Sequence, residues 1–517
     1  MLLGHIVETS RQVAETSKRL EKVRLLATLL KQLTPEETET AVAFLSGSVR
    51  QGRIGVGYAT LRDATGPPAE NATLEIREVD RALDALAAAK GPGSERTRRD
   101  LLHALLARAT AAEQHFLRRL LYGELRQGAL EGVMLEALAK ASGVGVERIR
   151  RAVMLAGEMA AVARTVLESG AARLDSYELQ LFRPVQPMLA NTAEGVAAAL
   201  DEVGEAALEF KFDGARVQVH RSGDDVVVYS RRLNDVTAAV PELVEAVRAL
   251  PGESLILDGE VLSLTPEGRP QPFQVTMRRF GRRLEVDRMR AELPLTPFWF
   301  DVLYWNGRSL LDEPQARRFH QLQELSPPGN LVPHTMTADP EHAAEFLHQA
   351  LERGHEGIMA KAPKSAYSAG SRGQNWLKIK QARTLDLVVL AAEWGNGRRQ
   401  GWLSNLHLGA RDTEKGGFAM LGKTFKGLTD QILAWQTEQF LKLEIGRDRY
   451  TVHVEPKLVV EIAFNEIQIS PRYKSGLALR FARVKRYRPD KSAEDADTFQ
   501  TVRQMAGLVR PETRAEK

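Results

Sequence analysis

Hydrophobic residues recur at helical spacing through the first third of the chain. A clear run has apolar side chains three and four positions apart at Val23, Leu26, Leu29 and Leu30, and alanine and leucine stay common up to about residue 183. Thr34-Pro35-Glu36-Glu37 has the residues of a capping box with proline at the first helical position, which predicts a helix start. We therefore expect an all-α domain over residues 1–183, with one of its helices over 146–167.

Two prolines between Arg183 and Ala190 end this pattern, and alternating apolar and polar positions replace it. Two short β-branched runs, 217–220 and 226–229, flank the turn residues Ser222-Gly223-Asp224-Asp225 and predict a hairpin. Further strands are expected over 254–264, 298–305, 357–361 and 376–380. The alternation with helices predicts a mixed α/β domain over residues 184–383.

After this domain the strands become short and lie between glycine-rich turns. The runs 387–392, 406–409, 417–421 and 459–464 have this character. They predict a small β-barrel over residues 384–510, followed by a frayed tail at 511–517.

The most informative stretch runs from Leu208 to Arg216. Read as a strand, it places Leu208, Phe210 and Phe212 on one face and Glu209, Lys211 and Asp213 on the other. Gly214 follows, where the backbone can turn or approach a ligand closely. By itself this pattern is typical of a solvated strand face with an ion pair; the alternative is the wall of a charged pocket.

Four later stretches repeat this placement of charged residues on strands and favour the pocket. They are Ser230-Arg231-Arg232, Leu257-Asp258-Gly259-Glu260, Glu356-Gly357-Ile358-Met359-Ala360-Lys361 and Trp376-Leu377-Lys378-Ile379-Lys380. Lysine and arginine suit the phosphates of a nucleoside triphosphate, and carboxylates suit a divalent metal and ribose hydroxyls. The five stretches together predict one site for a charged nucleotide.

The composition of the chain limits the kinds of metal site, partner and cell compartment that are expected. The 517 residues include no cysteine, which excludes disulfides and thiolate metal sites, and the net charge of +4 permits a polyanionic partner without requiring one. The N-terminus lacks the basic and apolar regions of a signal peptide, and no apolar run is long enough to span a membrane. We expect a cytoplasmic protein.

The helical domain contains a short sequence that occurs twice in similar form. Ser48-Val49-Arg50-Gln51-Gly52 corresponds to Glu124-Leu125-Arg126-Gln127-Gly128, and each follows an apolar helix. Turns of this kind present backbone N–H groups and an arginine at a helix end, which suits contacts with DNA phosphates. The alternative is a pair of similar helix ends without a ligand. On the first interpretation Arg50, Gly52, Arg126 and Gly128 bind DNA.

The full ordered set of motifs resembles the ATP-dependent DNA ligases of the covalent nucleotidyltransferase superfamily. Lys211-Phe212-Asp213-Gly214-Ala215-Arg216 is similar to their K-x-D-G-x-R motif, and the later stretches, with Phe300-Asp301, Leu479-Arg480-Phe481-Ala482-Arg483 and Arg488-Pro489-Asp490-Lys491, are similar to their other motifs. Ala482 departs from the family, in which many members carry proline. The resemblance covers nearly the whole chain and includes the N-terminal domain of archaeal and bacterial members.

The resemblance implies a multidomain α+β fold. Its parts are an all-α DNA-binding domain, a mixed α/β adenylyltransferase domain (ATP-grasp-like) and a C-terminal OB-fold barrel. It also implies a reaction in which ATP adenylates a lysine, AMP passes to a 5′-phosphate, and a 3′-hydroxyl then seals the nick. This activity serves replication, repair or recombination.

Residue roles follow from the same resemblance. Lys211 is expected to carry AMP, and a free lysine is protonated at neutral pH, so neighbouring cations such as Lys378 and Lys380 would favour its neutral form. The expected ATP-binding residues are Glu209 at the adenine, Phe300 stacked on it, Arg216, Arg231, Glu260, Arg372, Lys378, Lys380, Arg488 and Lys491. Glu260 and Glu356 are expected to bind Mg²⁺ or Mn²⁺. The roles of Asp213 and Asp258 stay open.

The expected partner is nicked double-stranded DNA, bound by a nucleoid-associated monomer. A sliding clamp is a candidate partner, although no clamp-binding peptide is evident near the N-terminus. Two alternatives remain: an RNA ligase or GTP-using capping enzyme, and a non-catalytic nick-binding protein. The long helical domain disfavours the first, and the intact charged motifs disfavour the second.

Overall fold

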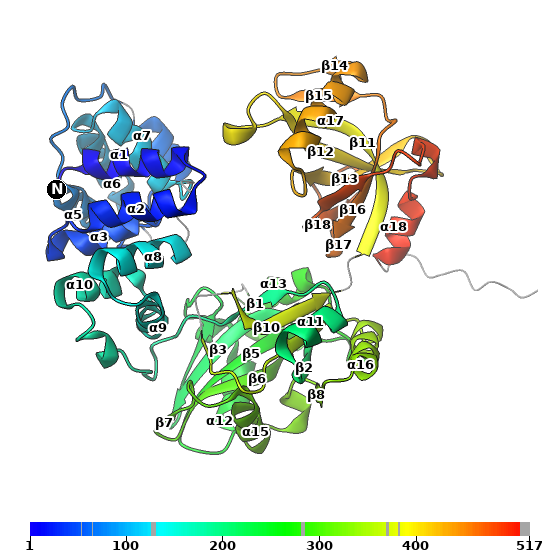
Figure 1. The fold of residues 1–517 in the computed structure, drawn as a ribbon, viewed down its shortest axis with the longest axis horizontal. Coiled ribbons are helices and arrows are strands. Elements are labelled where there is room, and N and C mark those ends of the chain that lie inside the picture. Colours follow the sequence, from blue (N-terminus) through cyan, green and yellow to red (C-terminus); the bar gives the residue numbers. More distant parts are fainter. Residues whose placement is uncertain are drawn as a thin grey trace, which may run out of the picture. The chain divides into compact units, whose positions relative to one another are not determined.

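The computed structural model describes residues 1–52, 54–64, 66–125, 131–280, 285–368, 372–380 and 383–506 (Figure 1). The expected tail at 511–517 lies outside these residues. The chain divides into two compact units, Met1–Ile379 and Lys380–Lys517. No helix in the described ranges is long and apolar enough to cross a membrane.

The first part of the first unit is helical, as the sequence predicts. Its helices are α1 (Leu3–Glu15), α2 (Arg19–Leu30), α3 (Pro35–Leu45), α4 (Tyr58–Asp63), α5 (Ile76–Ala88), α6 (Ser94–Ala107), α7 (Ala111–Leu121), α8 (Glu131–Ser142), α9 (Val146–Ala156) and α10 (Met159–Ser169). The predicted capping box is present at Thr34 and Glu37. The single helix expected over 146–167 is wrong: Gly157 adopts a φ of 70° and ends α9, and α10 begins two residues later.

Two five-stranded sheets form the middle of the chain. The first has the order β1 (Leu189–Thr192), β10 (Arg372–Lys380), β9 (Gly357–Lys361), β2 (Ala206–Lys211) and β8 (His334–Thr337). The second has the order β4 (Asp225–Ser230), β3 (Ala215–Ser222), β5 (Ser254–Ser263), β6 (Leu295–Trp305) and β7 (Arg308–Ser309). The predicted hairpin is the antiparallel β3–β4 pair. The Lys211–Ala215 stretch therefore carries the chain from one sheet to the other.

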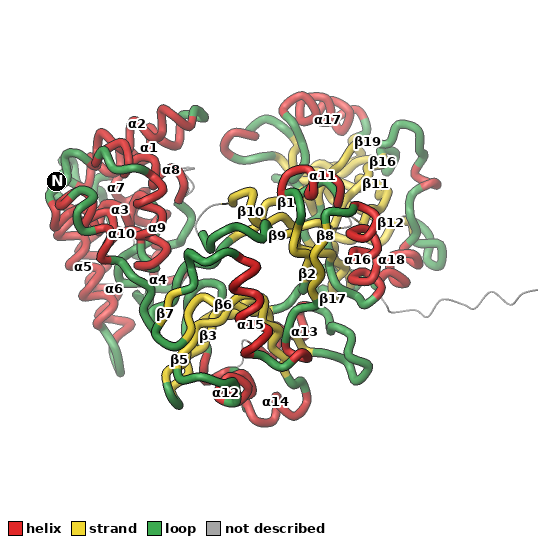
Figure 2. The backbone as a smooth tube through the Cα atoms, turned by 60° about the horizontal axis from the view of Figure 1, so that its bottom comes forward, coloured by secondary structure: helices red, strands yellow, loops and turns green. Residues whose placement is uncertain are grey.

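Helices cover both sheets and bury a shared apolar core. Helices α11 (Val196–Val203) and α16 (Pro340–Glu352) pack on the first sheet, and α12 (Pro241–Arg248), α13 (Phe273–Phe280) and α15 (Gln315–Leu325) pack on the second (Figure 2). Helix α14 (Val286–Glu292) precedes β6. Phe210 and Phe212 point into the core, so the face of β2 that carries Glu209 and Lys211 is turned the other way.

Residues 177–188, the connecting segment, join the helical part to the sheets. Buried polar groups dock this segment on the second sheet. The N–H of Phe182 donates to His220 Nδ1 (2.9 Å), the N–H of Val185 donates to Gln218 Oε1 (2.8 Å), and the Tyr229 hydroxyl donates to the Phe182 carbonyl (2.7 Å). Met154 and Leu155 of α9 share a core cluster with Val185 and Met188. The segment is thus part of the packed unit.

The second unit is rich in short strands. They are β11 (Arg383–Trp394), β12 (Leu403–Arg411), β13 (Phe418–Thr424), β14 (Glu444–Arg447), β15 (Thr451–Val454), β16 (Val459–Phe464), β17 (Glu466–Ile469), β18 (Leu477–Arg480) and β19 (Arg483–Tyr487), with helices α17 (Asp430–Lys442) and α18 (Phe499–Met505). Strand β11 pairs with β16 over its first half and with β12 and β15 over its second half. The predicted strands over 387–392, 406–409, 417–421 and 459–464 are confirmed within these elements, with a difference of one residue at 417.

His220 makes the fold sensitive to acid. Burial lowers the pKa of this histidine from its ordinary 6.5 to about 3. Between pH 6.5 and pH 3 the histidine is protonated in the unfolded chain and neutral in the folded chain. Neutral His220 therefore stabilises the fold fully above pH 6.5, and this stabilisation is lost as the pH falls toward 3. We expect His220→Gln to reduce the acid-side slope of the unfolding free energy by up to about 1.4 kcal/mol per pH unit.

Urea unfolding between about pH 4 and about pH 7 measures this slope, and the titrating groups that the substitution leaves unchanged cancel in the comparison with the parent chain. The matched control is His348→Gln on α16, because the His348 side chain is 70% exposed. Equal slopes for the parent chain and His220→Gln would contradict the prediction.

Candidate active site

Lys211 is the last residue of β2, and its amine is held by a carboxylate. Lys211 Nζ lies 2.7 Å from Glu356 Oε2 and also donates to the Phe212 carbonyl (3.2 Å). The pairing of β2 with β9 explains the contact: Lys211 lies opposite Gly357, and the N–H of Glu356 donates to the Lys211 carbonyl (3.1 Å). Glu356 is thus the charged partner of the Lys211 amine in this structure.

The cations expected near Lys211 lie on β10, two strands away from β2 in the same sheet. Lys378 Nζ donates to the Ala190 carbonyl at 3.5 Å, and Lys380 ends the strand. Their expected roles at the triphosphate stay predictions. The nearest charge around the resting amine is the carboxylate of Glu356, which sequence reasoning assigned to metal alone.

Glu209 forms a buried ion pair that the sequence did not predict. Glu209 Oε2 lies 2.6 Å from Lys361 Nζ, and the two side chains are 2% and 1% exposed. Lys361 also donates to the Phe300 carbonyl (3.1 Å) and lies over the rings of Phe300 (4.9 Å) and Trp376 (4.3 Å). Burial raises the pKa of Glu209 to about 7, against the attraction of Lys361.

The other oxygen of this carboxylate, Glu209 Oε1, is buried and has no hydrogen-bond partner among the described residues. An unpaired buried acceptor is costly unless a ligand satisfies it. An exocyclic amino group such as that of adenine is a donor of the required kind, and Lys361 brings Phe300 close to the same carboxylate. The residues present therefore fit a purine with an amino group.

Glu260 is tied to the turn that follows Lys211. Its Oε1 accepts from the N–H of Gly214 (3.1 Å), and a Cβ atom at position 214 would lie 2.3 Å from the Val261 carbonyl oxygen, so only glycine fits there. Burial raises the pKa of Glu260 to about 7, the charges of Lys211 and Arg216 oppose this rise, and Asp213 adds to it. Two carboxylates, Glu260 and Glu356, thus lie near the Lys211 amine.

No group of three metal-binding side chains exists in the described part of the chain. A site for Mg²⁺ does not require one, because this ion commonly takes one or two carboxylates and completes its shell with phosphates and water. The oxygen donors of Glu260 and Glu356 fit that requirement once a triphosphate is present.

Arg216 and Asp258 form a second pair beside Phe300. Arg216 Nη2 lies 2.7 Å from Asp258 Oδ2, Nη1 donates to the Met188 carbonyl (2.7 Å), and the guanidinium lies 5.3 Å from the Phe300 ring centre. The Tyr367 hydroxyl donates to Asp258 Oδ2 as well (2.6 Å). Sequence reasoning left Asp258 without a role; the structure makes it the partner of Arg216.

Asp301, the second residue of the Phe300-Asp301 motif, is a structural anchor. It forms a two-pronged ion pair with Arg318 of α15, at 2.7 and 3.0 Å, and both side chains are buried. The pair ties β6 to α15 at the residue that follows Phe300.

The remaining predicted residues are spread over the chain. Arg231 is exposed in the turn after β4, and Arg372 begins β10, where its side chain is outside what the structure describes. Arg488 and Lys491 belong to the second unit and meet at Asp386, where Asp386 Oδ2 lies 2.9 Å from Arg488 Nη1 and 2.7 Å from Lys491 Nζ.

Of the four predicted DNA contacts, Arg126 and Gly128 lie outside the described residues. Gly52 has a φ of 65° in the predicted turn. Arg50 is paired with Asp80 and Asp84 of α5, at 3.0 and 2.9 Å.

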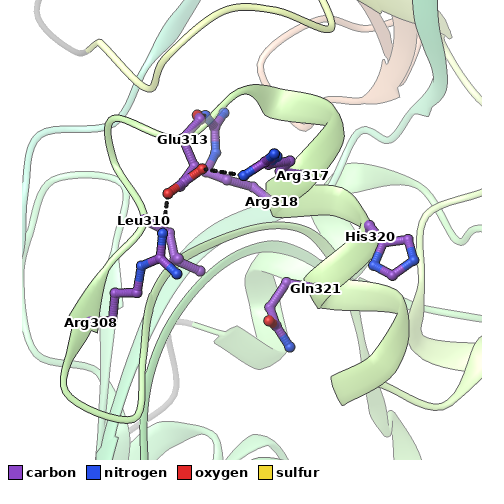
Figure 3. A pocket seen from close by; sticks show the side chains of 7 residues that line it. All are labelled: Arg308, Leu310, Glu313, Arg317, Arg318, His320 and Gln321. Atoms are coloured by element: carbon purple, nitrogen blue, oxygen red, sulfur yellow. Dashed lines mark hydrogen bonds and ion pairs between the residues drawn. The ribbon is translucent and has the colours of Figure 1, made fainter.

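A surface pocket between β7 and α15 contains none of the predicted site residues (Figure 3). It is lined by Arg308, Leu310, Glu313, Arg317, Arg318, His320 and Gln321. Glu313 pairs with Arg308 and, at 3.7 Å, with Arg317. The arginines that could attract an anion are thus engaged by an internal carboxylate.

Comparisons with known proteins agree on one family. Residues 187–380 match the model of the ATP dependent DNA ligase domain, 399–491 match the ATP dependent DNA ligase C terminal region, and 59–139 match the DNA ligase N terminus. A probable DNA ligase of Anaeromyxobacter sp. (strain Fw109-5) is 57% identical over 506 residues, which cover 97% of this chain and 98% of the relative. A probable DNA ligase of Saccharopolyspora erythraea is 53% identical over 510 residues and 99% of both chains.

Solved structures support the fold. A structure named Pmar-Lig_Pre. is 19% identical, covers 94% of this chain and 99% of its own, and has a TM-score of 0.62. This similarity extends over the helical, mixed and strand-rich parts together and confirms the expected fold class.

The buried Glu209–Lys361 pair generates a stability prediction. Lys361→Met would leave the Glu209 carboxylate buried and unpaired, so we expect a loss of about 3–5 kcal/mol of unfolding free energy. The double variant Glu209→Gln/Lys361→Met removes both charges and is expected to recover most of that loss. Urea unfolding followed by tryptophan fluorescence measures both values, and a double variant as unstable as Lys361→Met would contradict the expectation.

Proposed function

Because the chain belongs to the family of ATP-dependent DNA ligases, enzymes that seal nicks in DNA, we propose that its Lys211 carries AMP from ATP to the nick. The activity itself follows from the family, whose named relatives match the chain over nearly its full length. The observation that carries the residue assignment is the Lys211 amine, which lies 2.7 Å from the carboxylate of Glu356 and interacts electrostatically with Glu260. Lys211 also follows Glu209 by two positions on the same strand, and Glu209 Oε1 is buried without a partner among the described residues. Among the alternatives raised by the sequence, the family favours the DNA ligase.

The first step forms a bond between Lys211 Nζ and the α-phosphorus of ATP and breaks the bond from that phosphorus to pyrophosphate. The ammonium must first lose a proton, because only the neutral amine has a free electron pair. Glu356 lies 2.7 Å from the amine in the resting site and, as a proposed metal ligand, would leave this contact when ATP and the metal ion bind, with the proton passing to solvent. Separation of this pair on ATP binding is therefore the proposed activation event. AMP then passes to the 5′-phosphate of the nick, and the 3′-hydroxyl displaces it.

The nucleotide is proposed to bind along the polar face of β2. Glu209 Oε1 accepts from the adenine amino group, Phe300 stacks on the base, and Arg216, Arg231, Arg372, Lys378 and Lys380 contact the ribose, the triphosphate or the nick phosphate. Support comes from the buried, unsatisfied Glu209 Oε1 and from the contacts of Lys361 with both Glu209 and Phe300. The C6 amino group of adenine satisfies this oxygen, whereas guanine bound in the same orientation would place its O6 carbonyl, a second acceptor, against it.

Glu260 and Glu356 are proposed to hold Mg²⁺ or Mn²⁺ together with the phosphates of ATP. The ion would neutralise charge on the phosphates during the transfer. Glu260 keeps one oxygen on the N–H of Gly214, which fixes its orientation toward the Lys211 turn.

The second unit is proposed to supply Arg488 and Lys491 to the leaving pyrophosphate. In the resting protein both cations share Asp386, so phosphate oxygens would replace this carboxylate. The same exchange is proposed for Arg50, whose partners are Asp80 and Asp84. Such contacts are made to DNA phosphates and not to bases, so the affinity for DNA should fall strongly as the salt concentration rises.

Three domains are proposed, at residues 1–183, 184–383 and 384–510. This division is supported by the end of α10 at Ser169, the start of β1 at Leu189 and the beginning of the second compact unit at Lys380. The proposal also includes a monomer that acts in the cytoplasm near the nucleoid, with a sliding clamp as a candidate partner.

The assignment of Lys211 is tested by incubation with ATP labelled on the α-phosphate, followed by a denaturing gel. The parent chain is expected to retain the label, and Lys211→Ala is expected to lose it completely while still binding nicked duplex, because the covalent acceptor is gone. Lys364→Ala, at an exposed lysine after β9, is the matched control and should label normally. A labelled Lys211→Ala, or labelling by GTP in place of ATP, would contradict the assignment.

A further inference from the structure

The ion pair between Arg216 and Asp258 has an unusual, single-pronged geometry. Arg216 Nη2 meets Asp258 Oδ2, whereas Arg216 Nε and Asp258 Oδ1 are both buried and have no hydrogen-bond partner among the described residues. An arginine and a carboxylate normally form two parallel hydrogen bonds. Here both atoms needed for the second bond are available and unused, so another contact must hold the pair in this pose.

Tyr367 provides that contact. Its side chain is buried, and its hydroxyl donates to the same Asp258 Oδ2 (2.6 Å) that receives Arg216. The hydroxyl also accepts from the N–H of Met188 (3.0 Å), and Arg216 Nη2 approaches it at 3.4 Å. Burial and the charge of Asp258 raise the pKa of Tyr367, so the hydroxyl keeps its proton and remains a donor.

The backbone of Met188 completes the arrangement from the other side. Its carbonyl accepts from Arg216 Nη1 (2.7 Å) while its N–H donates to Tyr367. The guanidinium is thus held at two points, one on the connecting segment and one on β5. A rotation toward the two-pronged pair would have to break the bond to Met188 or displace the tyrosine hydroxyl.

We propose that Tyr367 is a positioning residue for ATP, which acts through Asp258 and Met188 to hold Arg216 in the orientation that meets the nucleotide. This inference rests on the proposed contact of Arg216 with ATP. It adds a residue that belongs to none of the recognised stretches, and it gives the buried Asp258 a function in substrate binding.

The ring of Tyr367 has a separate role that Tyr367→Phe preserves. It meets Trp376 edge-on at 6.0 Å, and Trp376 meets Phe300 in the same way at 6.0 Å. Removal of the hydroxyl alone leaves this aromatic packing in place, so the variant isolates the positioning of Arg216 from the support of Phe300.

The experiment measures self-adenylation of the full chain at a series of ATP concentrations. Tyr367→Phe is expected to raise the KM for ATP about tenfold, the size expected for a weakened hydrogen bond to a charged group, with little change in the maximal rate. The control is Tyr229→Phe, which removes a buried hydroxyl bond to the same connecting segment, at the Phe182 carbonyl. It should lower the melting temperature comparably and leave the KM unchanged.

The double variant Arg216→Ala/Tyr367→Phe tests the route of the effect. If Tyr367 acts through Arg216, the hydroxyl deletion adds less than about twofold to the KM of Arg216→Ala. A full tenfold addition would overturn the inference, as would a Tyr367→Phe enzyme with the parent KM beside an impaired Arg216→Ala. An unaltered KM for Arg216→Ala would instead overturn the proposed contact of Arg216 with ATP, and the inference with it.

Discussion

A carboxylate and an ammonium meet 2.6 Å apart at Glu209 and Lys361, where the protein excludes water. Neither charge could remain there alone, because an unpaired buried charge is strongly destabilising. Lys361 satisfies one oxygen of Glu209 and contacts both Phe300 and Trp376, so one cation fixes the carboxylate and two aromatic rings together. The other oxygen of Glu209 is left for a ligand. The proposed binding of the adenine base depends on this oxygen, which has no hydrogen-bond partner among the described residues.

Other buried pairs extend the same rigid framework. Arg318 and Asp301 join α15 to β6, and Arg279 meets Glu242 between α13 and α12 at 2.8 Å. These cations have almost no exposure, and replacement of their carboxylates by phosphate would first require opening the core. They hold the walls of the site and are unsuited to bind a substrate.

Three of the cations proposed to meet phosphates are held differently. Lys211 is paired with Glu356, Arg488 with Asp386, and Arg50 with Asp80 and Asp84, and each of these cations keeps 17–37% of its side chain exposed. Because these cations reach the surface, a phosphate can replace the internal carboxylate without opening the core. The chain thus combines buried pairs with partly exposed pairs.

The sequence alone determined the elements and the polar face of β2. Alternation from Leu208 to Asp213 placed Glu209 and Lys211 on one side. Gly214 was expected to allow a turn or the approach of a ligand, and in the structure it allows the close approach of the Val261 backbone. Local physics suffices for such features, because strand periodicity and turn geometry involve neighbours in the chain. The end of α9 at Gly157 was also a local signal, although the prediction overlooked it.

Only the tertiary structure decided which charges meet. Lys361 and Glu356 reach Glu209 and Lys211 through the antiparallel register of β2 with β9, about 150 residues later in the chain, and nothing near either strand specifies that register. Tyr367 meets Asp258 and Met188 across three separate segments. Sequence spacing predicted a pocket with these residue types, but partner choice depends on distances that long-range packing sets. These long-range contacts also decide which ion pairs are buried and which are partly exposed.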